Sequence, residues 1–454
     1  MKSSISRVAC LGLAAFAVLA VVRLAWSDQP DAASARRAAL PSPEQVEYLK
    51  MEREMFIHYG PAAFQGSQGG QPAMPADSII PLKLDTDQWC QVAKFWGAGQ
   101  IVFVAKHGDG FCWWQTDTSD YGIKETPYKD GKGDVVKELS ESCKKYGLKL
   151  GLYLAPCDVH LQAGLGGVAN DPARQSEITR LYRQQLTELL SRYGEVSEVW
   201  FDGSCKIDVS DILAKYTPKA MVFQGPQATL RWPGNEDGMV PYPAWQTVSR
   251  EAAATGTSTN EQSDPNGEVW LPMECDTPLM DHYWFWNLGL DSTMKSVEKL
   301  MEIYEKSVGR GSTLLLNATP DYSGLIPVSH VRRCQEFGAE IDRQFGHPAA
   351  EYMNPLLETC EGGTKYIELS LAETIEVDRT ILEEKIADGM RIRRYRIEGF
   401  SNGAWKTLVA NGESVGNKRI DRFEKTAVSK LRVVFEDSVG EPEILRFAAF
   451  KVLD

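Results

Sequence analysis

The chain has 454 residues, of which 43% are hydrophobic and 24% charged, and its formal net charge is −13. The length exceeds what one ordinary hydrophobic core holds, so two domains are predicted. The excess of acidic side chains argues against nucleic acid and anionic membranes as partners, and it is compatible with a neutral ligand such as a sugar.

Residues 1–27 have the pattern of a secretory signal peptide. Lys2 and Arg7 give a positive start, and Val8–Val22 is an uncharged, mostly apolar run of 15 residues. As a helix this run would span roughly 22 Å, less than the roughly 30 Å hydrocarbon core of a bilayer. We therefore predict a periplasmic or secreted protein, cleaved near Ala25-Trp26-Ser27. An uncleaved membrane anchor is the alternative.

The cysteines form no recognisable framework. Nine occur, Cys10 lies in the predicted signal peptide, and the other eight are widely spaced without Cys-x-x-Cys pairs. This spacing argues against a disulfide scaffold and a zinc ribbon. It leaves room for one or two disulfides in an exported protein.

Strand and helix patterns alternate up to residue 345, which is typical of βαβ units. A (β/α)8-type barrel fits roughly 300 residues better than an open sheet, so we predict an α/β fold with a catalytic barrel over 28–345. No nucleotide-binding glycine motif occurs. The predicted helices cover 43–51, 85–95, 134–146, 178–193, 294–307 and a segment ending near 343. The predicted strands cover 56–60, 101–105, 148–155, 197–202, 220–223 and 313–316, and a long loop covers 61–84.

The pattern changes after residue 346 to short alternating strands. Ser401-Asn402-Gly403 separates two of them in the manner of a hairpin turn. We therefore predict an all-β sandwich domain over 346–454. Its predicted strands cover 366–371, 391–401, 404–410, 430–436 and 444–452.

Polar side chains stand where predicted strands end. In Ser197–Gly203, the apolar residues Val199, Trp200 and Phe201 are followed directly by Asp202. A carboxylate there would lie at the edge where α/β barrels hold their chemistry. Capping of the next helix is the alternative role for Asp202.

Other strands end in the same way. His58 follows the first strand, and His107 with Asp109 follows the second. Glu274 lies in an apolar stretch 72 residues after Asp202 and is a second candidate carboxylate. Two carboxylates among many tryptophans suggest sugar chemistry, because aromatic rings stack on sugars and a carboxylate pair can supply nucleophile and acid/base. A salt-bridging Glu274 and tryptophans that only pack in the core are the alternatives.

Seven segments in this order resemble the α-L-fucosidases of glycoside hydrolase family 29. The Pro-x-Glu-x-Asp around Glu274, with Trp284-Phe285 after it, is similar to the branch that prefers α1,3/1,4-linked fucose on branched glycans. The segments are Phe56-Ile57-His58-Tyr59-Gly60-Pro61, Asp85-Thr86-Asp87-Gln88-Trp89, Ala105-Lys106-His107-Gly108-Asp109-Gly110-Phe111, Gly131-Lys132-Gly133-Asp134-Val135-Val136, Gly151-Leu152-Tyr153-Leu154-Ala155-Pro156, Glu198-Val199-Trp200-Phe201-Asp202-Gly203 and Leu314-Leu315-Leu316-Asn317-Ala318-Thr319-Pro320-Asp321.

The resemblance implies a retaining exo-glycosidase that removes fucose from a fucosylated oligosaccharide or glycoconjugate. Asp202 would be the nucleophile and Glu274 the acid/base, roughly 5–5.5 Å apart. The positions that hold the sugar would be His58, His107, Tyr153 and Trp200. The resemblance implies no metal and no cofactor.

The sequence departs from the family at Gly108, where a second histidine is usual, and in the loop around Gln65–Gln68. A hydrolase of the same mechanism for a different sugar is therefore one alternative. It would be indicated by activity on another deoxy-sugar or a galactosyl-type substrate, with none on fucosides. A non-catalytic glycan-binding protein is the other alternative. It would be indicated if Asp202→Asn left glycan processing unchanged.

Overall fold

The computed structural model describes residues 39–68, 74–360 and 362–453. The predicted signal peptide lies outside these residues. Within the described part of the chain, none of the helices combines the length and hydropathy that a membrane crossing requires. The eight cysteines after Cys10 are all free thiols here, so the disulfides that the sequence left open are absent among them.

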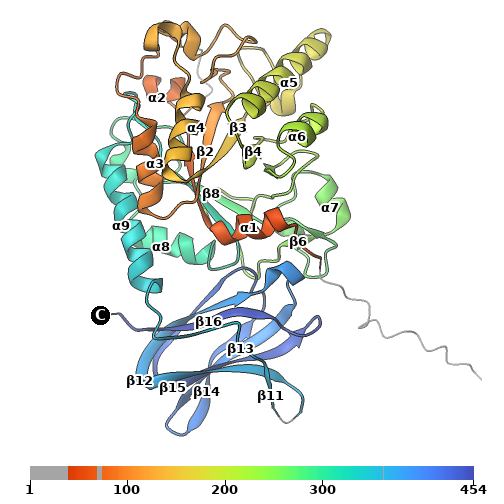
Figure 1. Ribbon diagram of the computed structural model, residues 1–454, viewed down its shortest axis with the longest axis vertical. Coiled ribbons are helices and arrows are strands. Elements are labelled where there is room, and N and C mark those ends of the chain that lie inside the picture. The colour runs from red at the N-terminus through yellow and green to blue at the C-terminus, as the bar shows by residue number, and fades with distance from the viewer. Residues whose placement is uncertain (1–38, 69–73, 361, 454) are drawn as a thin grey trace, which may run out of the picture. The chain divides into compact units, whose positions relative to one another are not determined.

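A curled sheet of seven parallel strands forms the centre of the first domain (Figure 1). Its edge strands are joined through one short segment, because Leu230 bridges to Phe223 and Arg231 bridges to Met273. This arrangement fits the predicted (β/α)8 barrel. The strands, in sheet order, are β5 (Met221–Phe223), β4 (Glu198–Trp200), β3 (Lys149–Leu154), β2 (Gln100–Lys106), β1 (Arg53–Ile57), β9 (Thr313–Asn317) and β8 (Glu274–Pro278).

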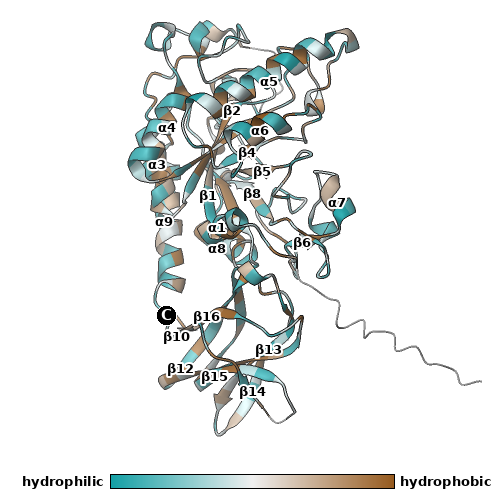
Figure 2. Cartoon of the chain, turned by 45° about the vertical axis from the view of Figure 1, so that its right-hand side comes forward, coloured by the Kyte–Doolittle hydropathy of each residue, from teal (hydrophilic) through white to brown (hydrophobic). Residues whose placement is uncertain are grey.

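The helices begin and end at signals that the sequence carries. The Asp85 side chain accepts hydrogen bonds from the backbone of Asp87 and Gln88, and Gly147 ends a helix in the left-handed conformation. Helices around the sheet carry both hydrophilic and hydrophobic residues (Figure 2). They are α1 (Pro43–Met51), α2 (Pro61–Gln65), α3 (Thr86–Phe95), α4 (Val135–Tyr146), α5 (Gln175–Arg192), α6 (Ser210–Tyr216), α7 (Arg250–Ala254), α8 (Val297–Lys306) and α9 (Val328–Phe345).

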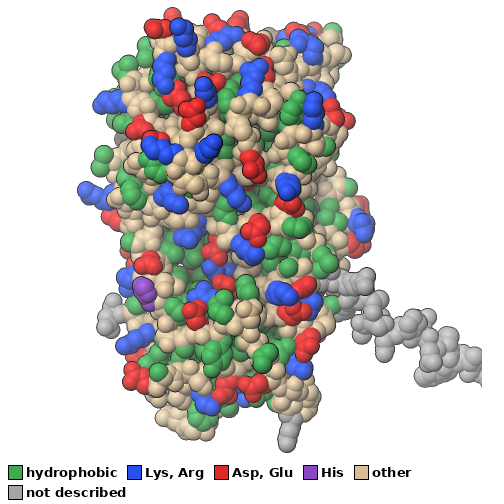
Figure 3. Space-filling view, viewed as in Figure 1, with side chains coloured by type: hydrophobic (Ala, Val, Ile, Leu, Met, Phe, Trp, Pro, Cys, Tyr) green, Lys and Arg blue, Asp and Glu red, His purple; other side chains and the backbone are tan. Residues whose placement is uncertain are grey.

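On the face shown in Figure 3, basic and acidic side chains are interspersed. No large area of one sign stands out on that face. Such a surface lacks the continuous positive stripe that a nucleic-acid backbone needs.

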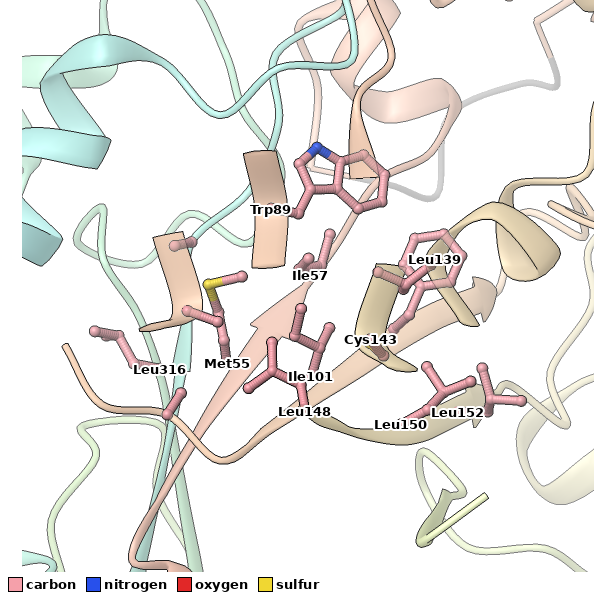
Figure 4. Close-up of a cluster of buried hydrophobic side chains, with 14 of the residues drawn as sticks. Met55, Ile57, Trp89, Ile101, Leu139, Cys143, Leu148, Leu150, Leu152 and Leu316 are labelled. Atoms are coloured by element: carbon pink, nitrogen blue, oxygen red, sulfur yellow. The ribbon is translucent and has the colours of Figure 1, made fainter. Parts of the chain in front are cut away.

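The strands of the parallel sheet are buried on both faces, which explains their continuous apolar runs. Met55 and Ile57 of β1 pack towards the helices with Trp89 of α3 (Figure 4). Phe56 lies between them in sequence and points into the barrel, where it packs with Trp200. The alternation along β1 thus separates an outer core from the interior of the barrel.

The C-terminal domain is one antiparallel sheet, in the order β10–β16–β12–β15–β13–β14, with β11 on β12. The sequence predicted a sandwich of short strands. Two of the strands are longer than predicted: they run for 20 residues each and pair across a register shift between Ser370 and Ile375. The strands are β10 (Ala350–Met353), β11 (Glu358–Thr359), β12 (Lys365–Glu384), β13 (Ile392–Ser401), β14 (Ala404–Gly412), β15 (Arg419–Ser438) and β16 (Ile444–Lys451).

This β domain contacts the end of the barrel at which the strands begin. Asn417 donates a hydrogen bond to the Leu49 carbonyl (2.9 Å), and Lys418 forms an ion pair with Glu52, the residue before β1. The guanidinium of Arg419 lies 3.9 Å from the ring centroid of Tyr242. The opposite edge, where the parallel strands end, is free of these contacts.

Candidate active site

The four predicted sugar-binding residues lie together where the parallel strands end. His58 and His107 follow β1 and β2, while Tyr153 and Trp200 belong to β3 and β4. The ring centroids of His58 and His107 are 5.9 Å apart, as are those of His107 and Tyr153. Tyr153 stacks on Trp200 at 5.3 Å. Four neighbouring strands therefore build one aromatic floor.

Asp202 stands over this floor. It is exposed, and the Tyr153 hydroxyl donates a hydrogen bond to its Oδ2 (2.9 Å). Burial, together with the charge of Asp202, holds the pKa of Tyr153 well above its ordinary value. Tyr153 therefore stays a phenol and a donor. It orients one carboxylate oxygen and leaves the other open to a ligand.

His58 is a neutral imidazole with one free nitrogen. Burial lowers its pKa well below the ordinary value, and the neighbouring His107 adds to this. Asn317 accepts from the His58 backbone (3.1 Å) and donates to the Trp284 carbonyl (2.8 Å), which fixes the orientation of its amide. The same amide oxygen lies 3.0 Å from His58 Nδ1, so Nδ1 carries the proton. His58 Nε2 is left as an acceptor for a ligand hydroxyl.

A second aromatic wall follows β8. The Trp284 ring centroid lies 4.9 Å from that of His58, and Phe285 lies 5.4 Å from His58 and 5.1 Å from His107. The sequence indicated Trp284 as one of several tryptophans near the candidate carboxylates, and Phe285 only through the family resemblance. Their contacts with both histidines enclose the space above the floor.

A second exposed carboxylate, Glu236, is tied to this wall. Trp284 donates a hydrogen bond from Nε1 to Glu236 Oε2 (3.1 Å). Glu236 lies in the loop after Leu230 and Arg231, which bridge the edges of the sheet. The sequence analysis missed it, because this bridging segment has no apolar strand pattern before the loop.

Asp276 of β8 supports the start of that loop. It is buried, and Trp232 donates a hydrogen bond from Nε1 to its Oδ1 (2.6 Å). Burial raises the pKa of Asp276 well above its ordinary value, and the charges of Glu274 and Glu236 raise it further. The buried Asp276 thus fixes the position of Trp232, and Trp232 lies four residues before Glu236 in the chain.

The prediction that Glu274 shares an edge with Asp202 is wrong. Glu274 begins β8, is fully buried, and has its carboxylate within 4.8 Å of those of Glu54 and Glu198. Asp202 lies past the end of β4, whereas Glu274 is the first residue of β8, so Glu274 belongs to the level where the strands begin and Asp202 to the edge where they end. β8 begins at Glu274 instead of ending there. The apolar residues just before Glu274 resemble a strand, which is why the sequence placed Glu274 at a strand end.

A buried ion pair lies behind His107. Lys106 Nζ is 2.7 Å from Asp158 Oδ2, and both side chains are almost fully buried. Asp158 Oδ1 also accepts from the Leu161 backbone (2.8 Å). This pair joins the end of β2 to the loop after β3, and so holds His107 relative to Tyr153.

We expect Lys106→Met to lower the free energy of unfolding by about 3–5 kcal/mol, because Asp158 would become an unpaired buried charge. Urea denaturation at neutral pH measures this. Lys50→Met, which removes an exposed ion pair with Glu47, should change stability little. A similar loss in both variants would contradict the assignment.

Gly108 faces open space. A Cβ built there would meet only the Cys157 sulfur, at 3.8 Å. We therefore expect Gly108→Ala to change the free energy of unfolding by less than about 0.5 kcal/mol. Gly110→Ala is the matched contrast, because its Cβ would lie 2.5 Å from Asp158 Oδ1 at a positive φ of 93°. Equal melting temperatures for these two variants would contradict this reading.

Two exposed carboxylates, a neutral histidine and aromatic walls at the strand ends of a parallel barrel form a site of the kind that cleaves glycosidic bonds. The α-L-fucosidase family model matches residues 44–344. α-L-Fucosidase 1 of Arabidopsis thaliana is 31% identical over 447 residues, which cover 89% of this chain and 86% of that protein. The chain therefore belongs to the α-L-fucosidase family and is a glycoside hydrolase.

Solved structures agree with this assignment. A putative α-L-fucosidase from Bacteroides thetaiotaomicron has a TM-score of 0.84 and 34% identity, and the match covers 92% of this chain and 100% of that one. A fucosidase from Ruminococcus gnavus, solved in complex with fucose, has a TM-score of 0.79 and 23% identity over 92% of this chain and 97% of that one. The second likeness supports the fold alone.

Proposed function

We propose that this protein is an exported α-L-fucosidase that removes terminal fucose from glycans with retention of configuration. The observation that carries the proposal is the exposed Asp202 carboxylate, oriented by Tyr153 within the aromatic floor. Family membership supports fucose as the sugar. The pattern of residues 1–27 supports export.

Two displacements at the anomeric carbon account for retention. In the first, an oxygen of Asp202 bonds to that carbon as the glycosidic bond breaks, and Glu236 gives its proton to the departing oxygen. In the second, Glu236 takes a proton from water, whose oxygen attacks the same carbon and displaces Asp202. We assign the acid/base role to Glu236 because it is exposed and held by Trp284, on the wall that packs against His58.

The sugar would lie between the floor and the Trp284–Phe285 wall. Aromatic faces suit the C–H faces of a sugar ring, and His58 Nε2 can accept from a hydroxyl. The resemblance around Trp284 supports branched α1,3/1,4-fucosylated glycans as the preferred substrates. None of the residues that form the described floor is a lysine or arginine that would bind an anionic sugar.

Free-sugar release by the purified mature chain tests this function. The substrates are an aryl α-L-fucoside, linear α1,2-fucosylated glycans and branched α1,3/1,4-fucosylated glycans, with Asp202→Asn as the control. Fucose from the branched glycans alone would support the function and the branch. Proton NMR of the first-formed fucose should show the α-anomer, and first-formed β-fucose would refute retention.

The open space at Gly108 favours one second candidate, a hydrolase of the same mechanism for a different sugar. A pocket without the side chain at this position could admit a sugar with an additional substituent. This candidate would be favoured if the folded protein released no sugar from any fucoside but released galactose from an α-galactosyl-type substrate.

A further inference from the structure

Three carboxyl groups meet inside the barrel, at the level where the strands begin. Glu54 of β1, Glu198 of β4 and Glu274 of β8 have carboxylate oxygens within 4.8 Å of one another. All three residues are fully buried. We call these residues the carboxyl triad. The proposed mechanism uses none of them.

The hydrogen bonds of the triad are unevenly distributed. Glu274 accepts two, from the Tyr48 hydroxyl (2.5 Å) and from Trp200 Nε1 (2.7 Å). Glu198 accepts one, from Gln100 Nε2 (2.6 Å). Neither carboxylate oxygen of Glu54 has a hydrogen bond of good geometry among the described residues, although the Gln100 amide lies near enough to lower its pKa. Burial raises the pKa of Glu274 as well, but the hydrogen bonds from Trp200 and Tyr48 act to lower it, so Glu274 is the member best able to carry charge.

The surroundings do not neutralise three charges. Lys149, at the exposed start of β3, is the cation that acts on Glu54. Burial raises the pKa of both Glu54 and Glu198 well above the ordinary value, and the charge of Glu274 raises them further. Tyr48 also stays protonated, because burial and Glu274 raise its pKa. Three buried carboxyl groups at this spacing cannot all ionise.

We propose that the carboxyl triad keeps two protons at neutral pH, on Glu54 and Glu198, and that anionic Glu274 positions Trp200 for sugar binding. Glu274 holds the indole N–H from below, while Tyr153 and Phe223 stack on the ring at 5.3 and 3.9 Å. The proton arrangement is independent of the proposed function. The effect on the sugar rests on it, since Trp200 lines the proposed binding site.

Solvent has a route towards the triad. A cavity of about 1000 Å³ lies at this end of the barrel, and its lining includes Tyr48, Gln100 and Ser197. Tyr48 and Gln100 are also the groups that hydrogen-bond Glu274 and Glu198. Protons can therefore exchange through side chains that touch both the cavity and the triad.

Infrared spectroscopy tests the protons without any substrate. Wild-type protein at neutral pH should show the carbonyl band of protonated carboxylic acids, and Glu54→Gln should lose part of it. Glu188→Gln is the matched control, since Glu188 is also buried and accepts from a tryptophan, Trp114 Nε1 (2.9 Å), but lies outside the triad. A band that Glu54→Gln leaves unchanged would overturn the proposal.

Denaturation measures the same protons as a linkage. Each proton that only the native state keeps raises the unfolding equilibrium constant about tenfold per pH unit, as the pH rises above the ordinary glutamate pKa. The unfolding equilibrium constant should therefore rise with pH less steeply in Glu54→Gln than in wild type, and the difference should be about a factor of ten per pH unit. Glu188→Gln should keep the wild-type slope. Stabilisation by Ca²⁺ or Mg²⁺ that Glu54→Gln abolishes would instead make the triad a cation site and overturn the proposal.

The positioning role is tested by two variants at Glu274. In Glu274→Gln the amide oxygen can still accept from Trp200, so KM for an aryl α-L-fucoside should stay within about threefold. In Glu274→Leu the indole loses its acceptor, and KM should rise at least tenfold with a smaller change in kcat. Equal KM values in two folded variants would refute the positioning role. If wild type cleaves no fucoside, the proposed function fails, and the infrared and denaturation results still decide the proton arrangement.

Discussion

Asp202→Asn should reduce kcat on an aryl α-L-fucoside by about 10⁴-fold or more, because an amide cannot form the covalent glycosyl-enzyme. The fold should be unaffected. Asp202 is exposed, and the asparagine oxygen can still accept from the Tyr153 hydroxyl. Initial rates and the melting temperature of the purified variant measure both effects.

Asp208→Asn is the matched control for this variant. Asp208 is also an exposed aspartate, and it accepts a hydrogen bond from the Ser210 backbone that asparagine can keep. Its rate should stay within about twofold of wild type. A loss below tenfold in Asp202→Asn would remove Asp202 as the nucleophile, and with it the double displacement.

Glu236→Gln should lower the rate on a fucosylated glycan by about 10²–10⁴-fold, which is the usual contribution of a general acid. The loss should be smaller on an aryl fucoside with a good leaving group, since such a group departs without a proton. The glutamine oxygen can still accept from Trp284 Nε1, so the wall over His58 should remain in place. The initial rates of the variant on the two substrates measure the effect.

The neighbouring residue gives the control for Glu236. Asp237 is exposed in the same loop, and Asp237→Asn should leave both rates within about twofold of wild type. An equal loss on both substrates in Glu236→Gln would show that Glu236 binds the sugar without transferring a proton.

Much of the floor of the site could be predicted from the sequence, because its signals are local. His58 and Asp202 directly follow short apolar runs, and His107 follows one after Lys106, whereas Tyr153 and Trp200 were indicated as site residues only by the family resemblance. The carboxyl ends of parallel strands meet at one edge, so such residues come together wherever the strands do.

The departures from prediction in the β domain have a local cause as well. Polar residues in the middle of β12 and β15 read as loops, although the strands continue through a bend.

The second carboxylate depended on tertiary structure. Glu274 and Glu236 are both glutamates near tryptophans, and the chain alone does not show which end of a strand each occupies. The pairing of Glu274 with Thr313, where β9 begins, puts Glu274 below Trp200. The bridge through Arg231 puts Glu236 on the loop that reaches Trp284. Sequence thus determined the barrel pattern and the residues at its strand ends. Strand register and barrel closure join segments far apart in the chain, and they decided which carboxylate is exposed beside Trp284 and which is buried in the carboxyl triad.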